Sequence, residues 1–282
     1  APNPSIDRLY ELERLRAGAI HRPTLSVAVP GGKGLNSARA AHTLGADVVA
    51  VTILRGHAGH WIEEQLERLG VRSRVVWASG ETRTCISIRD PETDGLTEIY
   101  DRGDPLATSD WTAMERLVDE ELGPGAELLT ISGGIPPGVD DDAFGRICRA
   151  ARRSGVRVLV DAYGPGLVGA LRERPWLVKL NAAEASELIG RPVQGESDAS
   201  QAADASRHAG LAVEHGQKVI GLSLTGLHAL VGEVQGNAQM IEQRPHMFLV
   251  AENAAVVPLG HAELADRFIQ RSFPGRPDDC AP

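Results

Sequence analysis

Short apolar runs alternate with amphipathic stretches over most of the chain. The apolar runs predict strands at Asp47–Leu54, Glu127–Ser132, Val156–Asp161, Trp176–Asn181 and Lys218–Thr225. Apolar positions at helical spacing predict helices at Leu35–Leu44, His60–Leu69, Asp110–Leu122, Asp140–Ser154, Ala182–Ile189 and Asp198–His215. Buried strands joined by helices are typical of a mostly parallel sheet covered on both faces. The pattern therefore predicts one doubly wound α/β domain over residues 1–282.

Two segments, residues 6–29 and 82–101, interrupt this pattern because they lack long helices. In the second segment an alternating run, Thr82–Arg89, is followed by the turn Asp90–Gly95 and by Leu96–Tyr100, which predicts a hairpin. We interpret both segments as a small β-lid, here called the flap. The flap either covers a site or is an extension of the sheet edge without a function of its own. The tail, residues 272–282, is rich in Pro, Asp and Arg and is expected to be frayed.

The run Gly31-Gly32-Lys33-Gly34-Leu35-Asn36 precedes the first predicted helix. Glycines let the backbone turn tightly and approach a ligand, and Lys33 adds a cation to this turn. The free N–H groups of the following helix favour anions. This combination predicts a site for a polar, phosphorylated small molecule. The alternative is a turn that only joins a strand to a helix.

Composition narrows the class of protein. The 282 residues carry a net charge of −9, which disfavours a general nucleic-acid or anionic-membrane surface. Three widely spaced cysteines form no metal pattern and no disulfide framework, so we expect a cytoplasmic protein. No apolar run is long enough to span a membrane and no signal peptide is visible. The sequence begins with Ala1 rather than Met, so a segment is expected to be missing upstream.

Six short segments occur in a fixed order: Pro2–Asp7, Gly31–Asn36, Thr82-Arg83 with Thr97-Glu98, Ile131–Gly138, Val178–Glu184 and Leu222–Gly226. In this order they resemble the motifs of the phosphofructokinase B family of ribokinase-like sugar kinases. The nearest branch holds 1-phosphofructokinase and tagatose-6-phosphate kinase. The resemblance covers about residues 2–232 and implies the ribokinase-like α/β fold. In that fold the first strand would precede Pro2.

The resemblance also implies roles for individual residues. Those at the sugar phosphate would be Asp7, Gly32, Lys33, Asn36, Arg83, Glu98 and Ser132. Asp7 and Asn36 would bind sugar hydroxyls, while Lys33 and Arg83 would hold the phosphate. Those at the nucleotide would be Lys179, Asn181, Ser223, Thr225 and Gly226, with Glu184 holding Mg²⁺ through water.

Each of these residues also has a simpler explanation. Asp7 and Asn36 could cap a turn or a helix, and Lys33, Arg83 and Glu98 could be solvated charges. Asn181 and Glu184, three residues apart, could be a pair that starts a helix. Ser223 and Gly226 could simply form the turn that ends a strand.

The family's catalytic turn, Gly-Ala-Gly-Asp or a close variant, begins a late helix and supplies an anion hole and a general base. The nearest segment in position is Gly260-His261-Ala262-Glu263. On that alignment Gly260, His261 and Ala262 form the anion hole and Glu263 is the base. Alternatively, Glu263 is an ordinary charge in the first turn of a helix. The sequence also departs from the family at Gly134, where Ser is usual.

Two functions from different classes follow. The favoured one is ATP-dependent phosphorylation, with Mg²⁺, of fructose 1-phosphate, fructose 6-phosphate or tagatose 6-phosphate, by a protein that forms a homodimer through the flap. The alternative is a catalytically impaired homologue that binds sugar phosphate or nucleotide as a sensor or partner. A dinucleotide-dependent oxidoreductase is disfavoured because Gly31–Gly34 lacks the G-x-G-x-x-G spacing.

Overall fold

A computed structural model describes residues 1–92, 96–193, 218–223, 250–251 and 254–255 of the chain, and the structural statements below concern these residues. Its larger sheet is parallel and has the strand order β10-β9-β8-β7. The strands are β7 (Leu128–Ser132), β8 (Arg157–Asp161), β9 (Leu177–Asn181) and β10 (Lys218–Ser223). Helices α4 (Ala143–Arg153), α5 (Gly164–Arg172) and α6 (Ala182–Ile189) follow β7, β8 and β9. The predicted α/β fold with a mostly parallel sheet is confirmed.

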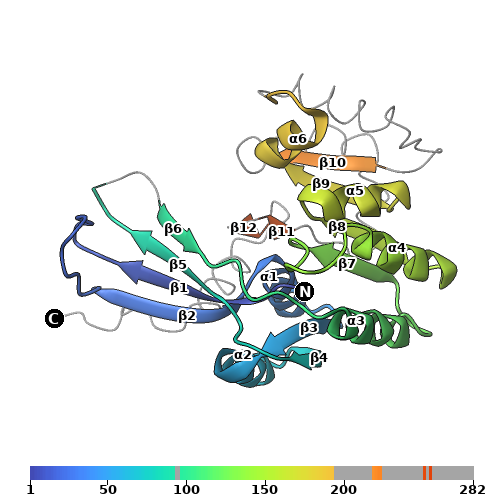
Figure 1. The fold of residues 1–282 in the computed structure, drawn as a ribbon, viewed down its shortest axis with the longest axis horizontal. Coiled ribbons are helices and arrows are strands. Elements are labelled where there is room, and N and C mark those ends of the chain that lie inside the picture. The colour runs from blue at the N-terminus through green and yellow to red at the C-terminus, as the bar shows by residue number, and fades with distance from the viewer. Residues whose placement is uncertain (93–95, 194–217, 224–249, 252–253, 256–282) are drawn as a thin grey trace.

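A second parallel pair lies beside this sheet, made of β3 (Val49–Arg55) and β4 (Arg72–Ala78). Helix α2 (Gly56–Arg68) joins these two strands, and α3 (Thr108–Glu121) packs against both. Helix α1 (Lys33–Thr43) contacts β2, β3 and β7, which places it where the flap meets the body (Figure 1). Two short strands, β11 (Val250–Ala251) and β12 (Ala254–Ala255), pair antiparallel.

The two segments assigned to the flap form one four-stranded sheet with the order β2-β1-β5-β6. The strands are β1 (Ser5–Glu11), β2 (Leu25–Gly31), β5 (Thr84–Arg89) and β6 (Leu96–Tyr100). Strand β1 pairs antiparallel with β2 and parallel with β5, and β6 forms the outer edge. Figure 1 shows this sheet projecting to one side of the helix-covered body.

Two apolar clusters hold the body together. The larger one lies between α3, α4 and the parallel sheet and includes the fully buried Trp111 and Phe144. The smaller one joins α1, α2 and β3 to Ile6 of the flap. The helix faces that the apolar spacing predicted therefore point into these clusters. Among the described helices, none is long and apolar enough to cross a membrane.

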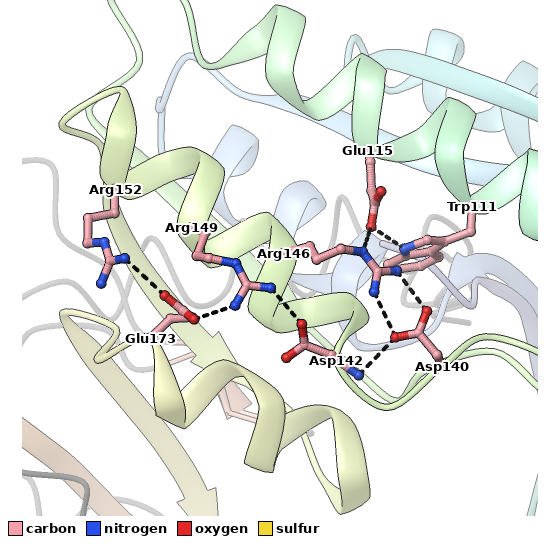
Figure 2. A network of polar contacts seen from close by, with 8 residues as sticks. All are labelled: Trp111, Glu115, Asp140, Asp142, Arg146, Arg149, Arg152 and Glu173. Atoms are coloured by element: carbon pink, nitrogen blue, oxygen red, sulfur yellow. Dashed lines mark hydrogen bonds and ion pairs between the residues drawn. The ribbon is translucent and has the colours of Figure 1, made fainter.

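A ladder of charged side chains crosses the surface of α4 (Figure 2). Arg146 donates to Glu115 of α3 at 2.7 Å and forms a two-pronged contact with Asp140 at 2.7 and 2.8 Å. The hydrogen bonds to Arg146 hold the pKa of Asp140 below its usual range. Arg149 continues the ladder to Asp142 and to Glu173 at the end of α5. These contacts fix three successive helices relative to one another.

Four described elements were not predicted: strand β4 and helix α5 of the body, and the short strands β11 and β12. The predicted helix Asp198–His215 and the tail 272–282 lie outside the described residues, as does most of the chain after residue 223.

Candidate functional site

The carboxylate of Asp7 lies at the start of the flap, against the glycine turn. Its Oδ1 accepts a hydrogen bond from Ser5 Oγ at 2.6 Å. Its Oδ2 accepts from the backbone N–H of Gly32 at 3.2 Å and from Asn36 Nδ2 at 3.4 Å. A Cβ added to Gly31 would stand 2.0 Å from this carboxylate, so only glycine permits the approach. The structure thus brings together Asp7, Gly32 and Asn36.

Gly32 and Arg39 contact Asp7 and Asn36, respectively. Gly32 is the N-cap residue directly before α1 and has a φ of 83°, a backbone conformation that residues with a side chain rarely adopt. Arg39 donates from Nη1 to Pro30 O at 2.9 Å and to Asn36 Oδ1 at 3.2 Å. Burial lowers the pKa of Arg39, and the charge of Asp7 opposes that shift. Arg39 lies three residues after Asn36, one helical turn away, a signal that sequence reasoning overlooked.

Lys33, the first residue of α1, reaches in the opposite direction, toward the parallel sheet. Its Nζ lies 2.6 Å from Glu184 Oε1 and 3.5 Å from Asp161 Oδ1, and it lies 5.5 Å from the ring centre of Tyr163. Only 12% of the Lys33 side chain is exposed. Lys33, which was predicted to hold the phosphate of the sugar substrate, is therefore ion-paired inside the protein in this structure.

The carboxylate partners of Lys33 come from the ends of β8 and the start of α6. Asp161 ends β8, and both its oxygens accept from Lys179 Nζ of β9, at 3.2 and 3.3 Å. Lys179 is buried, and its ammonium group lies against the carboxylate of Asp161. Burial raises the pKa of Asp161, and the charges of Lys33 and Lys179 oppose that shift.

Asn181 and Glu184 form a reciprocal cap at the start of α6. The Asn181 side chain accepts from the N–H of Glu184 at 2.8 Å, and Glu184 Oε2 accepts from the N–H of Asn181 at 2.9 Å. This is the helix-starting pair that the sequence left open as an alternative. Since Glu184 Oε1 also binds Lys33, the same carboxylate serves the cap and the charge cluster.

The remaining strand-end residues lie along one edge. Ser132 ends β7 opposite Asp161, and Ser223 ends β10 opposite Asn181. Ser132 is buried beside Gly133, whose N–H donates to Asp161 O at 2.8 Å. In open α/β sheets ligands bind outside this carboxyl edge.

The flap residues Arg83 and Glu98 contact protein groups. Arg83 donates from Nη1 to Asp101 O at 2.9 Å and from Nη2 to Asn3 O at 3.1 Å, while its buried Nε has no partner within the described residues. Glu98, on the exposed strand β6, accepts from Tyr100 OH at 2.7 Å and from Ser87 Oγ at 3.3 Å. Partial desolvation of the hydroxyl and its hydrogen bond to Glu98 raise the pKa of Tyr100.

Residues 3–220 match the pfkB family of carbohydrate kinases. The chain belongs to this family. Tagatose-6-phosphate kinase of Staphylococcus epidermidis is 30% identical over 196 residues, which make up 69% of this chain and 62% of that protein. The chain thus spans less than two thirds of that relative's length.

Solved structures agree with the family assignment. Phosphofructokinase-2 from Escherichia coli in complex with fructose-6-phosphate superposes with a TM-score of 0.67 and 30% identity, over 74% of this chain and 69% of that one. A possible 1-phosphofructokinase from Thermotoga maritima gives 0.64 and 26%, over 73% and 67%.

One departure of this pfkB-family chain from the usual motif has a physical reason. A Cβ on Gly134 would stand 2.6 Å from the hydroxyl of Tyr163. With Tyr163 in this position, a side chain at 134 would have to displace its hydroxyl, whereas glycine leaves room for it. Tyr163 precedes α5, and its ring also lies near Lys33.

Several predicted site residues of this pfkB-family chain lie outside the described part of the structure. They are Thr225, Gly226, Gly260, His261, Ala262 and Glu263. All of them also lie beyond the last residue of the family match. Of Ser223 only the place in β10 is described.

Among the described residues of this pfkB-family chain, the oxygen donors fit magnesium through a bridging water. In the described ranges no three His, Cys, Asp or Glu side chains gather that could hold a metal directly. Both oxygens of Glu184 already accept hydrogen bonds, from Lys33 and from Asn181. Since a carboxylate oxygen has more than one lone pair, Glu184 could still accept from a metal-bound water. Magnesium usually keeps several waters and binds few carboxylates, so this indirect contact suits it.

A cavity of about 470 Å³ opens next to this cluster, between α5 and α6. Glu184 is one of its lining residues, and Leu167, Val168 and Leu188 contribute apolar surface. Of the four charged residues described above, Glu184 alone lines this cavity, which has the volume of a small-molecule site.

Proposed function

We propose that the chain transfers the γ-phosphoryl group of ATP to a hydroxyl of a phosphorylated ketohexose: fructose 1-phosphate, fructose 6-phosphate or tagatose 6-phosphate. One observation carries this proposal. Lys33 of the glycine turn lies 2.6 Å from Glu184 of the Asn-x-x-Glu motif, so two motifs far apart in sequence adjoin in one place. Family membership and the sugar phosphates named for the relatives support the same reaction.

On the acceptor side, Asp7 and Asn36 bind sugar hydroxyls. The carboxylate of Asp7 is already held by Gly32 and Ser5, so it meets the substrate in a fixed orientation. Lys33 and Arg83 hold the phosphate, with Gly32, Glu98 and Ser132 at the margins of the same site.

On the nucleotide side, Asn181, Ser223 and Lys179 form the edge at which ATP binds, together with Thr225 and Gly226. Glu184 holds Mg²⁺ through water, and the metal, when bound, offsets the charge of the phosphates. Glu263 takes the proton from the attacking hydroxyl, and Gly260, His261 and Ala262 surround the transferring group. Phosphoryl transfer needs mainly positioning and charge stabilisation, which these residues supply.

A second function, binding of a sugar phosphate or nucleotide without transfer, has one observation in its favour. The family match ends at residue 220, before the segment that holds Glu263. The part of the site that binds would then be present while the part that catalyses is altered.

Two further features of the proposal concern assembly and setting. The edge strand β6 is exposed along its whole length and carries Leu96, Ile99 and Tyr100, a surface that suits pairing of two flaps in a homodimer. The free thiols of Cys85 and Cys148 suit a reducing cytoplasm.

The test is ADP release in a coupled assay, with MgATP and each of the three sugar phosphates. Turnover that Glu263→Gln reduces by about 10²- to 10⁴-fold supports the kinase and its base. No turnover with any acceptor, together with a rise in Tm on adding a sugar phosphate, supports the binding protein. Neither turnover nor a rise in Tm contradicts both functions.

A further inference from the structure

The ion pair between Lys33 and Glu184 joins two sites that the proposed function assigns to different ligands. The two side chains are only 12% and 10% exposed, and 151 residues separate them in sequence. Lys33 belongs to the acceptor phosphate and Glu184 to the hydrated cation of the nucleotide. Lys33 therefore occupies the carboxylate that the hydrated cation requires, and Glu184 occupies the ammonium group that the sugar phosphate requires.

Of the two described carboxylates near Lys33, Glu184 is the one that an incoming phosphate must displace. Within the described residues the cluster contains two ammonium groups, Lys33 and Lys179, and two carboxylates, Asp161 and Glu184. Asp161 is held by Lys179 through both oxygens, and it lies 0.9 Å farther from Lys33 (3.5 Å) than Glu184 does (2.6 Å). An incoming phosphate dianion at Lys33 therefore competes more with Glu184 than with Asp161.

We propose that the Lys33–Glu184 ion pair couples the binding of the two substrates. Sugar phosphate draws Lys33 away from Glu184, and the released carboxylate then accepts the hydrated cation of the nucleotide. Each ligand thus removes a competitor of the other and raises its affinity. By linkage the factor is the same in both directions, and couplings of this kind are typically about 5- to 150-fold. The inference rests on the proposed function. It adds cooperativity between the two substrates, which holds whichever substrate binds first.

Isothermal titration calorimetry tests the coupling without any turnover. Fructose 1-phosphate, fructose 6-phosphate and tagatose 6-phosphate are each titrated into the full chain, with and without saturating Mg²⁺ and a non-hydrolysable ATP analogue. In the wild type the sugar phosphate that binds is expected to bind at least about fivefold more tightly when the analogue is present.

Glu184→Gln is the decisive variant, because glutamine also forms the helix cap but carries no charge. Without the competing carboxylate, sugar phosphate alone is expected to bind about tenfold more tightly, and the coupling factor falls to about one. A residue with a purely structural role would weaken binding when changed. Glu67→Gln is the control, since it removes the same charge from an exposed position of another helix, α2, and leaves both affinities unchanged.

Lys33→Met breaks the pair from the other side and does not disturb the cap. It is expected to tighten binding of the analogue alone, because Glu184 no longer has a cationic partner at 2.6 Å.

If the wild type binds both ligands independently, the inference is overturned while the proposed function stands. The same holds if Glu184→Gln weakens sugar phosphate on its own, or if Lys33→Met leaves analogue binding unchanged. If the wild type binds no sugar phosphate, the proposed function fails and the inference fails with it.

Discussion

Removing the buried charges of Asp161 and Lys179 one at a time should destabilise the protein unequally. Their side chains are 8% and 5% exposed, and the ammonium lies 3.2 and 3.3 Å from the two carboxylate oxygens. Asp161 has a second cation, Lys33, at 3.5 Å. Within the described residues the hydrogen bonds of the Lys179 ammonium go to Asp161 alone. The two variants therefore leave different charges without a partner.

The magnitudes follow from these distances. At an effective dielectric constant of about 20, each lysine attracts the carboxylate by about 5 kcal/mol before desolvation is subtracted. Asp161→Asn leaves a buried ammonium without its counter-charge, and such changes cost about 3–5 kcal/mol. Lys179→Met leaves Asp161 with Lys33, so we expect a loss of only about 1–3 kcal/mol, the value of hydrogen bonds to a charged group. The double variant removes both charges and should lie within about 1 kcal/mol of the wild type.

Urea denaturation at pH 7, followed by circular dichroism, measures these free energies of unfolding. The single variants should shift the midpoint without changing the slope, which would show that stability rather than compactness has changed. The reasoning is refuted if Asp161→Asn costs no more than Lys179→Met. It is also refuted if the double variant loses the sum of the two single changes, because non-additivity is the signature of a direct pair.

Two further predictions address the glycine turn and the surface ladder. In Gly31→Ala the new Cβ would stand 2.0 Å from the Asp7 carboxylate, so the carboxylate must move and calorimetry should show sugar-phosphate affinity lower by about 10- to 100-fold. Gly123→Ala, whose Cβ would make only an ordinary contact at 3.5 Å, should leave affinity unchanged. Arg146→Met removes the two-pronged contact with Asp140, and urea titration should show a loss of about 1 kcal/mol; no loss would mean that the ladder is not stabilising.

Local signals explain why much of the body could be predicted. Helix α6 was predicted with the bounds that it has, Ala182–Ile189, because Asn181 and Glu184 start it and Gly190, with a φ of 69°, ends it. The strands of the parallel sheet are buried on both faces, so they read as short apolar runs in the sequence.

Strand β4 and helix α5, which were not predicted, lack such signals. Strand β4 begins with Arg72, Ser73 and Arg74, whose polar side chains obscure the apolar run. Helix α5 contains three glycines and a proline at its start, a composition that disfavours helix and is tolerated here because its apolar side is buried.

The candidate site was predictable by residue type but not by partner. The glycine turn indicated an anion site from its composition, and the structure does place Asp7 and Asn36 beside it. No local spacing connects Lys33 to Asp161 or Glu184, because the folding of the sheet brings them together. Asp161 could have been noticed as a charge that closes a buried strand, Arg157–Asp161.

Coupling and catalysis can be tested separately in this chain, because the ion pair that couples the ligands and the proposed base lie in different segments. The Lys33–Glu184 contact lies within both the family match and the described residues, whereas Glu263 lies outside both. A protein that couples sugar phosphate to nucleotide without releasing ADP would therefore have an intact binding site and an altered catalytic turn. In that case the charged cluster at the carboxyl edge of the sheet would provide cooperativity between the two ligands rather than turnover. Glu184→Gln would abolish this cooperativity, whereas Glu263→Gln would leave it unchanged.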